Sequence, residues 1–115
     1  MENFKQTNLD DNILRAISEM GFATPTTVQA KTIPHLLNTD TDLIATAQTG
    51  TGKTAAFGLP SIHLTDLKKK DTSTLVLCPT RELCIQIAKD LTKYSKYIDG
   101  LKILAVYGGS DIRGQ

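Results

Sequence analysis

Apolar residues recur at helical spacing in four stretches of the chain. The first stretch ends at Gly21, a natural helix stop. The second opens with Thr24 as a cap and Pro25 in the first turn, and Pro34 is expected to shorten or kink it. The pattern predicts helices over residues 9–20, 24–37, 53–64 and 81–97.

Short apolar runs alternate with the last two of these helices. Residues 42–46, 74–78 and 101–107 each have the length and composition of a buried strand. Strands that alternate with helices imply a parallel sheet with right-handed crossovers and helices on its faces. We therefore expect an α/β fold whose strands are apolar on both sides. Three strands leave an exposed edge, so we expect an incomplete domain of a longer protein.

Composition and charge narrow the function classes. The chain has 115 residues, 40% hydrophobic and 22% charged, as in an ordinary globular protein. No apolar run approaches the roughly 20 residues that span a bilayer, and no secretory signal opens the chain. The two cysteines, Cys78 and Cys84, are too few to form the disulfide framework of a small secreted domain. This favours a reducing, cytoplasmic setting. The net charge of +1 creates no global field for nucleic acid, so any such function must come from local geometry.

A glycine-rich loop lies between the first predicted strand and the third predicted helix. Residues 47–54 read Ala-Gln-Thr-Gly-Thr-Gly-Lys-Thr and fit the Walker A pattern, except that alanine replaces the leading glycine. Gly50 and Gly52 allow backbone amides to point into one concavity, and the following helix adds its N-terminal dipole. Lys53 is placed to reach the β- and γ-phosphates, and the Thr54 hydroxyl to ligate Mg²⁺. The alternative is a Gly/Thr-rich surface loop with an incidental lysine.

Three further segments point to a family. Residues 21–29 read Gly-Phe-Ala-Thr-Pro-Thr-Thr-Val-Gln, residues 79–83 read Pro-Thr-Arg-Glu-Leu, and residues 108–109 are both glycine. Together with the phosphate loop they resemble the Q motif, motif Ia, the GG element and motif I of the DEAD-box RNA helicases of superfamily 2. The resemblance covers essentially the whole chain. It implies residues 1–37 as an N-terminal helical segment with the Q motif, and residues 38–115 as the first part of a RecA-like, P-loop ATP-binding domain.

The resemblance implies an ATP site. Gln29 is expected to read adenine, because a glutamine amide pairs in bidentate fashion with adenine N6 and N7 and rejects guanine. Phe4 matches the family's upstream aromatic that stacks on the base, and Thr26 the threonine that supports the phosphate loop. For Gln29 the alternative is a glutamine on the helix surface, and for Phe4 it is a residue of a disordered tail. The implied phosphate and Mg²⁺ contacts come from Gln48, Thr49, Gly50, Thr51, Gly52, Lys53 and Thr54.

The resemblance also implies an RNA site. The family grips RNA backbone with motif Ia and the GG element, and such contacts are independent of base sequence and sensitive to salt. The implied residues are Pro79, Thr80, Arg81, Gly108 and Gly109. The alternative is that Arg81 belongs only to a helix start and the glycines only to a turn.

The implied protein is an ATP-dependent RNA helicase that contains a second RecA-like domain in cis. The 115 residues contain no Asp-Glu-Ala-Asp element and no Ser-Ala-Thr element. We therefore expect the fragment alone to lack appreciable ATP hydrolysis and unwinding. Two alternatives stay open: a DNA helicase or translocase of superfamily 2, and a non-catalytic ATP-binding module if residue 115 is the true terminus.

Overall fold

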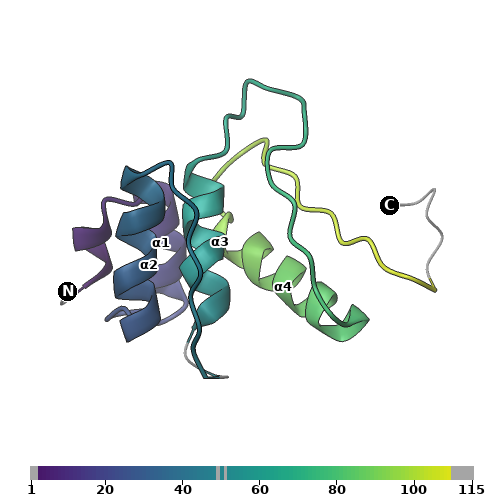
Figure 1. Cartoon of the computed structure of the whole chain (residues 1–115). Coiled ribbons are helices and arrows are strands. Elements are labelled where there is room, and N and C mark those ends of the chain that lie inside the picture. The colour runs from purple at the N-terminus through teal and green to yellow at the C-terminus, as the bar shows by residue number, and fades with distance from the viewer. Residues whose placement is uncertain (1–2, 49, 51, 110–115) are drawn as a thin grey trace.

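The structure, a computed structural model, describes residues 3–48, 50 and 52–109, and these residues form five helices (Figure 1). The four predicted helices are all present, with ends that differ by a few residues. A short 3-10 helix at the start was not predicted. The elements are η1 (Phe4–Thr7), α1 (Asp11–Glu19), α2 (Thr27–Asn38), α3 (Lys53–His63) and α4 (Arg81–Tyr94).

The second helix departs from its prediction at both ends. It begins at Thr27 rather than after Thr24, because Thr26 and Gln29 form a reciprocal capping box that fixes the first turn. It also continues through Pro34 to Asn38, so the expected shortening is wrong. Proline removes one helical hydrogen bond, but the fully buried Ile33 beside it holds the helix in the core.

The hydrophobic core lies between the helices. Helix α3 is the centre of this packing, since it contacts both α2 and α4, while α1 contacts α4. Gly58 of α3 lets α4 approach closely: a methyl group there would lie 2.6 Å from Cδ2 of Leu91. The core takes side chains from η1 through α4, and its buried members are Phe4, Leu9, Ile13, Ile17, Ile33, Ala55, Leu59, Ile62 and Tyr94.

The three predicted strands are extended segments that do not form a sheet in the described part of the chain. Residues 42–46, 74–78 and 101–107 carry no strand assignment there, and no backbone hydrogen bond joins two of these segments. The described residues therefore do not show the predicted pairing of strands. An apolar run favours extended backbone, but a ladder also needs a neighbour about 4.8 Å away, and a local pattern does not supply that neighbour.

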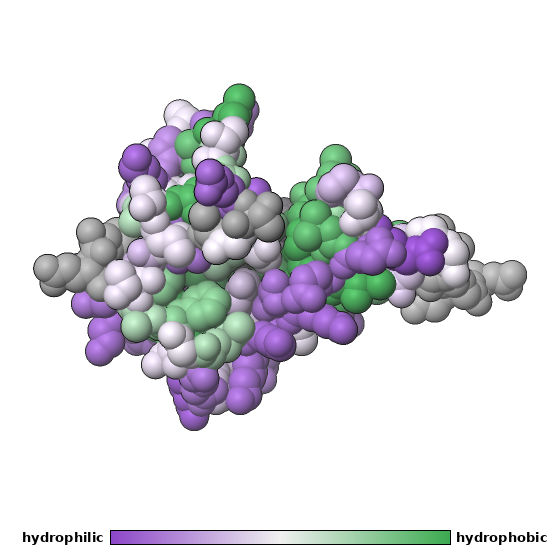
Figure 2. All heavy atoms as spheres, turned by 90° about the horizontal axis from the view of Figure 1, so that it is seen from below, coloured by the Kyte–Doolittle hydropathy of each residue, from purple (hydrophilic) through white to green (hydrophobic). Residues whose placement is uncertain are grey.

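These segments also contradict the expectation of burial on both sides. Leu75 and Leu77 are exposed, while Val76 and Cys78, each next along the chain, are half-buried; this is the alternation of a one-sided strand. Ile44 is 94% exposed. Figure 2 shows hydrophobic surface on the half of the molecule where Figure 1 places α4 and the segments around 75 and 105. No helix in the described residues is long and apolar enough to cross a bilayer.

Candidate nucleotide and RNA site

Gln29 is the best-anchored of the predicted site residues. Its side-chain oxygen accepts a hydrogen bond from the Thr26 backbone N–H at 2.9 Å. The backbone N–H of Gln29 donates to the Thr26 hydroxyl oxygen at 3.4 Å. The side chain is 4% exposed, so the alternative of a surface glutamine is wrong. Thr26 and Gln29 thus form one unit at the start of α2.

The same side chain reaches the phosphate loop. Nε2 of Gln29 donates to the carbonyl oxygen of Gly52 at 3.1 Å, across 23 residues of sequence. Gly52 has a left-handed backbone with φ of 78°, and a methyl group there would overlap Nε2 of Gln29. Glycine is therefore required for two reasons, backbone conformation and close approach. The contact joins the start of α2 to the start of α3.

The phosphate loop leads directly into a helix, as predicted. Helix α3 begins at Lys53 with Gly52 as its cap, and Gly50 also has a left-handed backbone with φ of 86°. Lys53 is exposed at the first position, and Thr54 behind it is half-buried. Helix α3 runs on through buried residues, so its N-terminal dipole is fixed to the core. Gln48 is exposed, and the predicted contacts Thr49 and Thr51 lie outside the described residues.

Phe4 is not a disordered tail residue. It lies in η1, is 5% exposed, and packs against Phe22 with ring centroids 6.0 Å apart. Phe22 in turn meets Tyr94 edge-on at 6.0 Å. The ring of Phe4 therefore belongs to the core in this conformation, and stacking on a base requires it to leave the packing.

The two predicted RNA-binding segments meet. Thr80 caps α4, with its hydroxyl accepting the Leu83 N–H at 3.1 Å. Arg81 follows, and its guanidinium lies against Gly109, where a methyl group would be 3.0 Å from Nη2. Gly109 is left-handed, with φ of 84°, while Pro79 and Gly108 are exposed. The Arg81 guanidinium and the Gly109 backbone thus come together from segments 28 residues apart, and a cation at this place suits a phosphate group.

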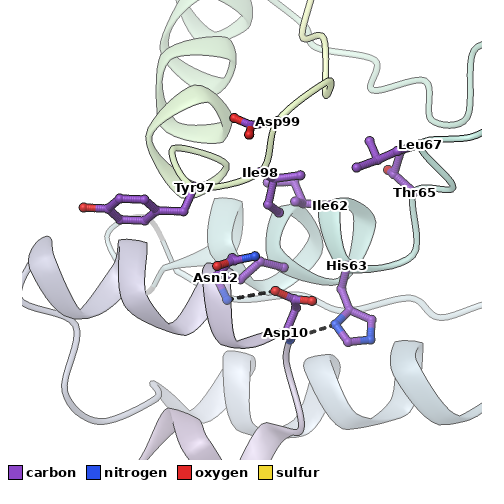
Figure 3. Close-up of a pocket in the computed structure, with 10 residues that line it drawn as sticks. Asp10, Asn12, Ile62, His63, Thr65, Leu67, Tyr97, Ile98 and Asp99 are labelled. Carbon is purple, nitrogen blue, oxygen red and sulfur yellow. Dashed lines mark hydrogen bonds between the residues drawn. The ribbon is translucent and has the colours of Figure 1, made fainter.

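A pocket of about 290 Å³ lies at the far end of α3 from the phosphate loop (Figure 3). There the Asp10 backbone N–H donates to Nδ1 of His63 at 3.0 Å, and Asp10 also accepts the Asn12 N–H at 2.8 Å. The histidine thus joins the start of α1 to the end of α3. In the described residues no group of three or more potential ligands is placed to hold a metal ion. This pocket is a joint between helices rather than part of the nucleotide site.

An ionic cluster ties α1 to the end of α4. Tyr97 donates to both carboxylate oxygens of Glu19, and Lys96 pairs with the same carboxylate at 3.2 Å. The Tyr97 hydrogen bond lowers the pKa of Glu19, against a smaller effect of desolvation. The guanidinium of Arg15 stacks over the Tyr97 ring at 3.9 Å. Sequence reasoning missed this cluster, because Lys96 and Tyr97 lie 77 and 78 positions after Glu19 in the chain, and no local pattern links residues so far apart.

Sequence reasoning also misplaced the cap of α2, although a signal was present. Thr26 and Gln29 are spaced as a capping box, a pattern that marks a helix start in the sequence itself. That pattern gives the glutamine a structural role beside any role in binding.

Comparison with known proteins decides the family. The DEAD/DEAH box helicase family model matches residues 26–115, most of the chain. The chain belongs to the DEAD/DEAH box helicase family. The resemblance drawn from the motifs is confirmed.

Individual family members agree with this assignment. An ATP-dependent RNA helicase CshA of Listeria monocytogenes is 50% identical over 115 residues, which are all of this chain and 22% of the relative. The ADP-bound RNA helicase Prp28 of Chaetomium thermophilum matches with a TM-score of 0.86 at 35% identity, over 100% of this chain and 29% of that one. Dbp5 of S. cerevisiae, bound to RNA and ADP BeF3, matches with a TM-score of 0.80 at 31% identity, over 84% and 25%. At this level the fold is that of DEAD-box helicase domains, and the chain spans about a fifth of the length of the curated relatives it matches.

Proposed function

We propose that this chain supplies the ATP site and part of the RNA-binding surface of an ATP-dependent RNA helicase. The observation that carries the proposal is the hydrogen bond from Gln29 to the Gly52 carbonyl, because it puts a candidate base reader against the phosphate loop. The names of the relatives, several of them ATP-dependent RNA helicases, support the same activity. The cytoplasmic setting stays a prediction.

Gln29 keeps the atoms that adenine needs. A glutamine amide has two N–H donors and an oxygen with two lone pairs. In the structure one donor is used by Gly52 and one lone pair by Thr26. The second donor and the second lone pair are the pair that adenine N7 and N6–H₂ require. Base binding therefore needs no break in the link between α2 and α3. Stacking of Phe4 on the base stays a prediction that includes its release from Phe22.

The phosphates and the metal ion fit the start of α3. The backbone amides of Gln48, Gly50 and residues 52–54, the Lys53 cation and the α3 dipole together offer positive potential to a triphosphate. The Thr54 hydroxyl is an oxygen donor of the kind Mg²⁺ accepts beside phosphate oxygens and water. Bound Mg²⁺ would neutralise part of the negative charge of the phosphates. Thr54 would hold the ion, and Lys53 would hold the outer phosphates.

We propose that Arg81 and Gly109 bind the RNA backbone, with Pro79, Thr80 and Gly108 beside them. The contact between the guanidinium and Gly109 supports it, since two segments then present one surface to a phosphate. We further propose that residues 42–46, 74–78 and 101–107 are strands of the α/β P-loop sheet in the complete first domain. Their outward apolar side chains and the similarity to solved helicases support this. The complete protein then contains a second RecA-like domain in cis.

Calorimetric titration of ATP·Mg²⁺ and GTP·Mg²⁺ tests the nucleotide site. Lys53→Ala is expected to abolish binding while circular dichroism stays unchanged, because the variant removes an exposed charge and no core contact. Retained binding at wild-type affinity would overturn the phosphate-loop assignment.

Gln29→Ala tests the base reader in the same assay. A bidentate pair is worth about 1–3 kcal/mol of base discrimination, so the preference for ATP over GTP should narrow by about fivefold to a hundredfold. Thr26→Ala is the matched control, because it removes the capping hydroxyl and leaves the amide. An unchanged ATP-to-GTP ratio in Gln29→Ala would remove Gln29 from the base site.

Duplex substrates separate the RNA helicase from the DNA helicase or translocase. The full-length protein is expected to unwind a short RNA duplex with ATP and to leave the matched DNA duplex paired. Unwinding of DNA alone would contradict the proposal. ATP binding without hydrolysis or unwinding would favour a non-catalytic module.

A further inference from the structure

The pocket at the far end of α3 is bounded by the ends of three helices (Figure 3). It lies where α1 begins, where α3 ends at His63, and where the chain leaves α4 through Tyr97, Ile98 and Asp99. Its volume of about 290 Å³ is just below the roughly 300–1,000 Å³ of small-molecule sites, so it has room for a small ligand only. None of its lining residues is among those predicted to bind ATP or RNA.

Two carboxylates lie on opposite sides of an apolar floor in this pocket. Figure 3 shows Asp10 and Asp99 on either side of Ile62 and Ile98, and all four residues line the pocket. Ile62 is buried and Ile98 is half-buried against the core, whereas both aspartates are exposed. A ligand on this floor therefore contacts hydrocarbon along its middle and has a carboxylate near each end.

The pocket offers negative charge and no cation of its own. Within the described residues, no lysine or arginine lines it, and neither aspartate is part of an ion pair. Nδ1 of His63 accepts the Asp10 N–H at 3.0 Å, so that nitrogen carries no proton and the ring adds no positive charge in this arrangement. Helix α3 ends at the same histidine and adds the negative end of its dipole. The pocket is therefore complementary to a cation.

We propose that this pocket binds a small aliphatic diamine, with one ammonium group at Asp10, the other at Asp99, and the carbon chain on Ile62 and Ile98. Two ammonium groups suit the pocket better than one, because each carboxylate then has a counter-ion. The carbon chain also covers apolar surface, which a metal ion does not. In the part of the chain that the structure describes, no three potential ligands are placed to hold such an ion. The site is separate from the proposed ATP and RNA sites and does not rest on them.

Methyl NMR of the full-length protein tests the site in the absence of nucleotide and RNA, which are themselves anions. The isoleucine methyl groups are labelled with ¹³C, and 1,4-diaminobutane is titrated. The signals of Ile62 and Ile98, assigned from Ile62→Val and Ile98→Val, should shift and saturate with a Kd on the order of 1 mM, as expected for two exposed ion pairs and a short apolar chain. The signal of Ile44, which does not line the pocket, should stay in place. Signals of Ile62 and Ile98 that do not move, or that move without saturation, would overturn the proposal.

The second ammonium group is tested with 1-aminobutane, which has the same chain and one charge. It should bind the wild type about twofold to fivefold more weakly than the diamine, the equivalent of one exposed ion pair. Asp99→Asn should remove this difference, and so should Asp10→Asn, whose amide oxygen can still cap α1. Glu82→Gln is the matched control, because it removes a like charge at the other end of α4 and should keep the difference. Equal affinities of the two amines for the wild type, or a difference that survives in both aspartate variants, would contradict the two-carboxylate site.

A lysine side chain of a partner protein offers the same chemistry from another source. A tripeptide with a central lysine and blocked ends is therefore titrated alongside, and it should bind no more tightly than 1-aminobutane, since it also carries one ammonium group. Tighter binding of the tripeptide than of the diamine would replace the diamine with a protein partner and so overturn the proposal.

Discussion

The helices and the extended segments of this chain both contain runs of apolar residues, but these residues lie in opposite environments. Leu59 in α3 is fully buried, whereas Leu77 in the segment after it is 85% exposed. A helix satisfies its own backbone and needs only one apolar face covered. An extended segment needs neighbours for its backbone and for two faces. The same hydrophobicity therefore stabilises the helical part and leaves the segments with an open apolar side.

The largest expected effect comes from a cavity in the helical part. Leu59→Ala removes a fully buried side chain and should lower the free energy of unfolding by about 2–5 kcal/mol. Ile44→Ala is the control in an extended segment, and at 94% exposure it should change stability by less than about 0.5 kcal/mol. Urea unfolding followed by helical circular dichroism measures both. Equal losses would break the comparison.

A smaller effect is expected where α3 meets α4. Gly58→Val inserts methyl groups where even one would lie 2.6 Å from Cδ2 of Leu91, and overpacking should cost about 1–3 kcal/mol. Gly108→Val is the control, because nothing lies within 4 Å of a methyl group there. Thermal unfolding should separate the two variants clearly. A wild-type melting temperature for Gly58→Val would show that Leu91 simply moves aside.

Tyr94 gives the helical core a pH dependence. Burial raises its pKa from 10.0 to about 12, with a further contribution from Asp90. Between those values the unfolded chain has lost the phenolic proton and the folded chain retains it, so stability falls as pH rises. The loss should reach about 1.4 kcal/mol at pH 11. Urea unfolding at pH 9 and pH 11 measures it. Tyr94→Phe should lose less stability over that interval, and an equal loss would remove Tyr94 as the cause.

The smallest effect is expected at the ionic cluster on the surface. Glu19→Gln removes the charge that pairs with Lys96 and accepts from Tyr97. Such solvent-exposed pairs contribute little to stability, and less at high salt. Because the pKa of Glu19 is lowered in the folded chain, its contribution is present above the ordinary carboxyl range and is lost on acidification. Unfolding at pH 7 and pH 3, at low and high salt, should show this for the wild type and not for the variant.

The sequence predicted the parts of the fold that depend on local pattern. The four helices were predicted, because amphipathic spacing and capping residues lie within one helix and at its ends. The pairing of the extended segments depends on which segments become neighbours, and a local pattern does not determine that. In the site, the motifs identified Gln29 and Gly52 singly. The hydrogen bond between them, and the meeting of Arg81 with Gly109, depend on packing between distant segments.

The outward apolar side of the extended segments has a consequence for biosynthesis. A ribosome delivers the chain from its N-terminus at about 5–20 residues per second. Helices α1 to α3 therefore leave the ribosome first and can pack on one another, while Leu75, Leu77 and Val106 stay exposed in the segments that follow. The nascent chain then carries a formed helical layer beside exposed apolar segments. Such segments are the kind that a chaperone binds and that otherwise pair with another chain.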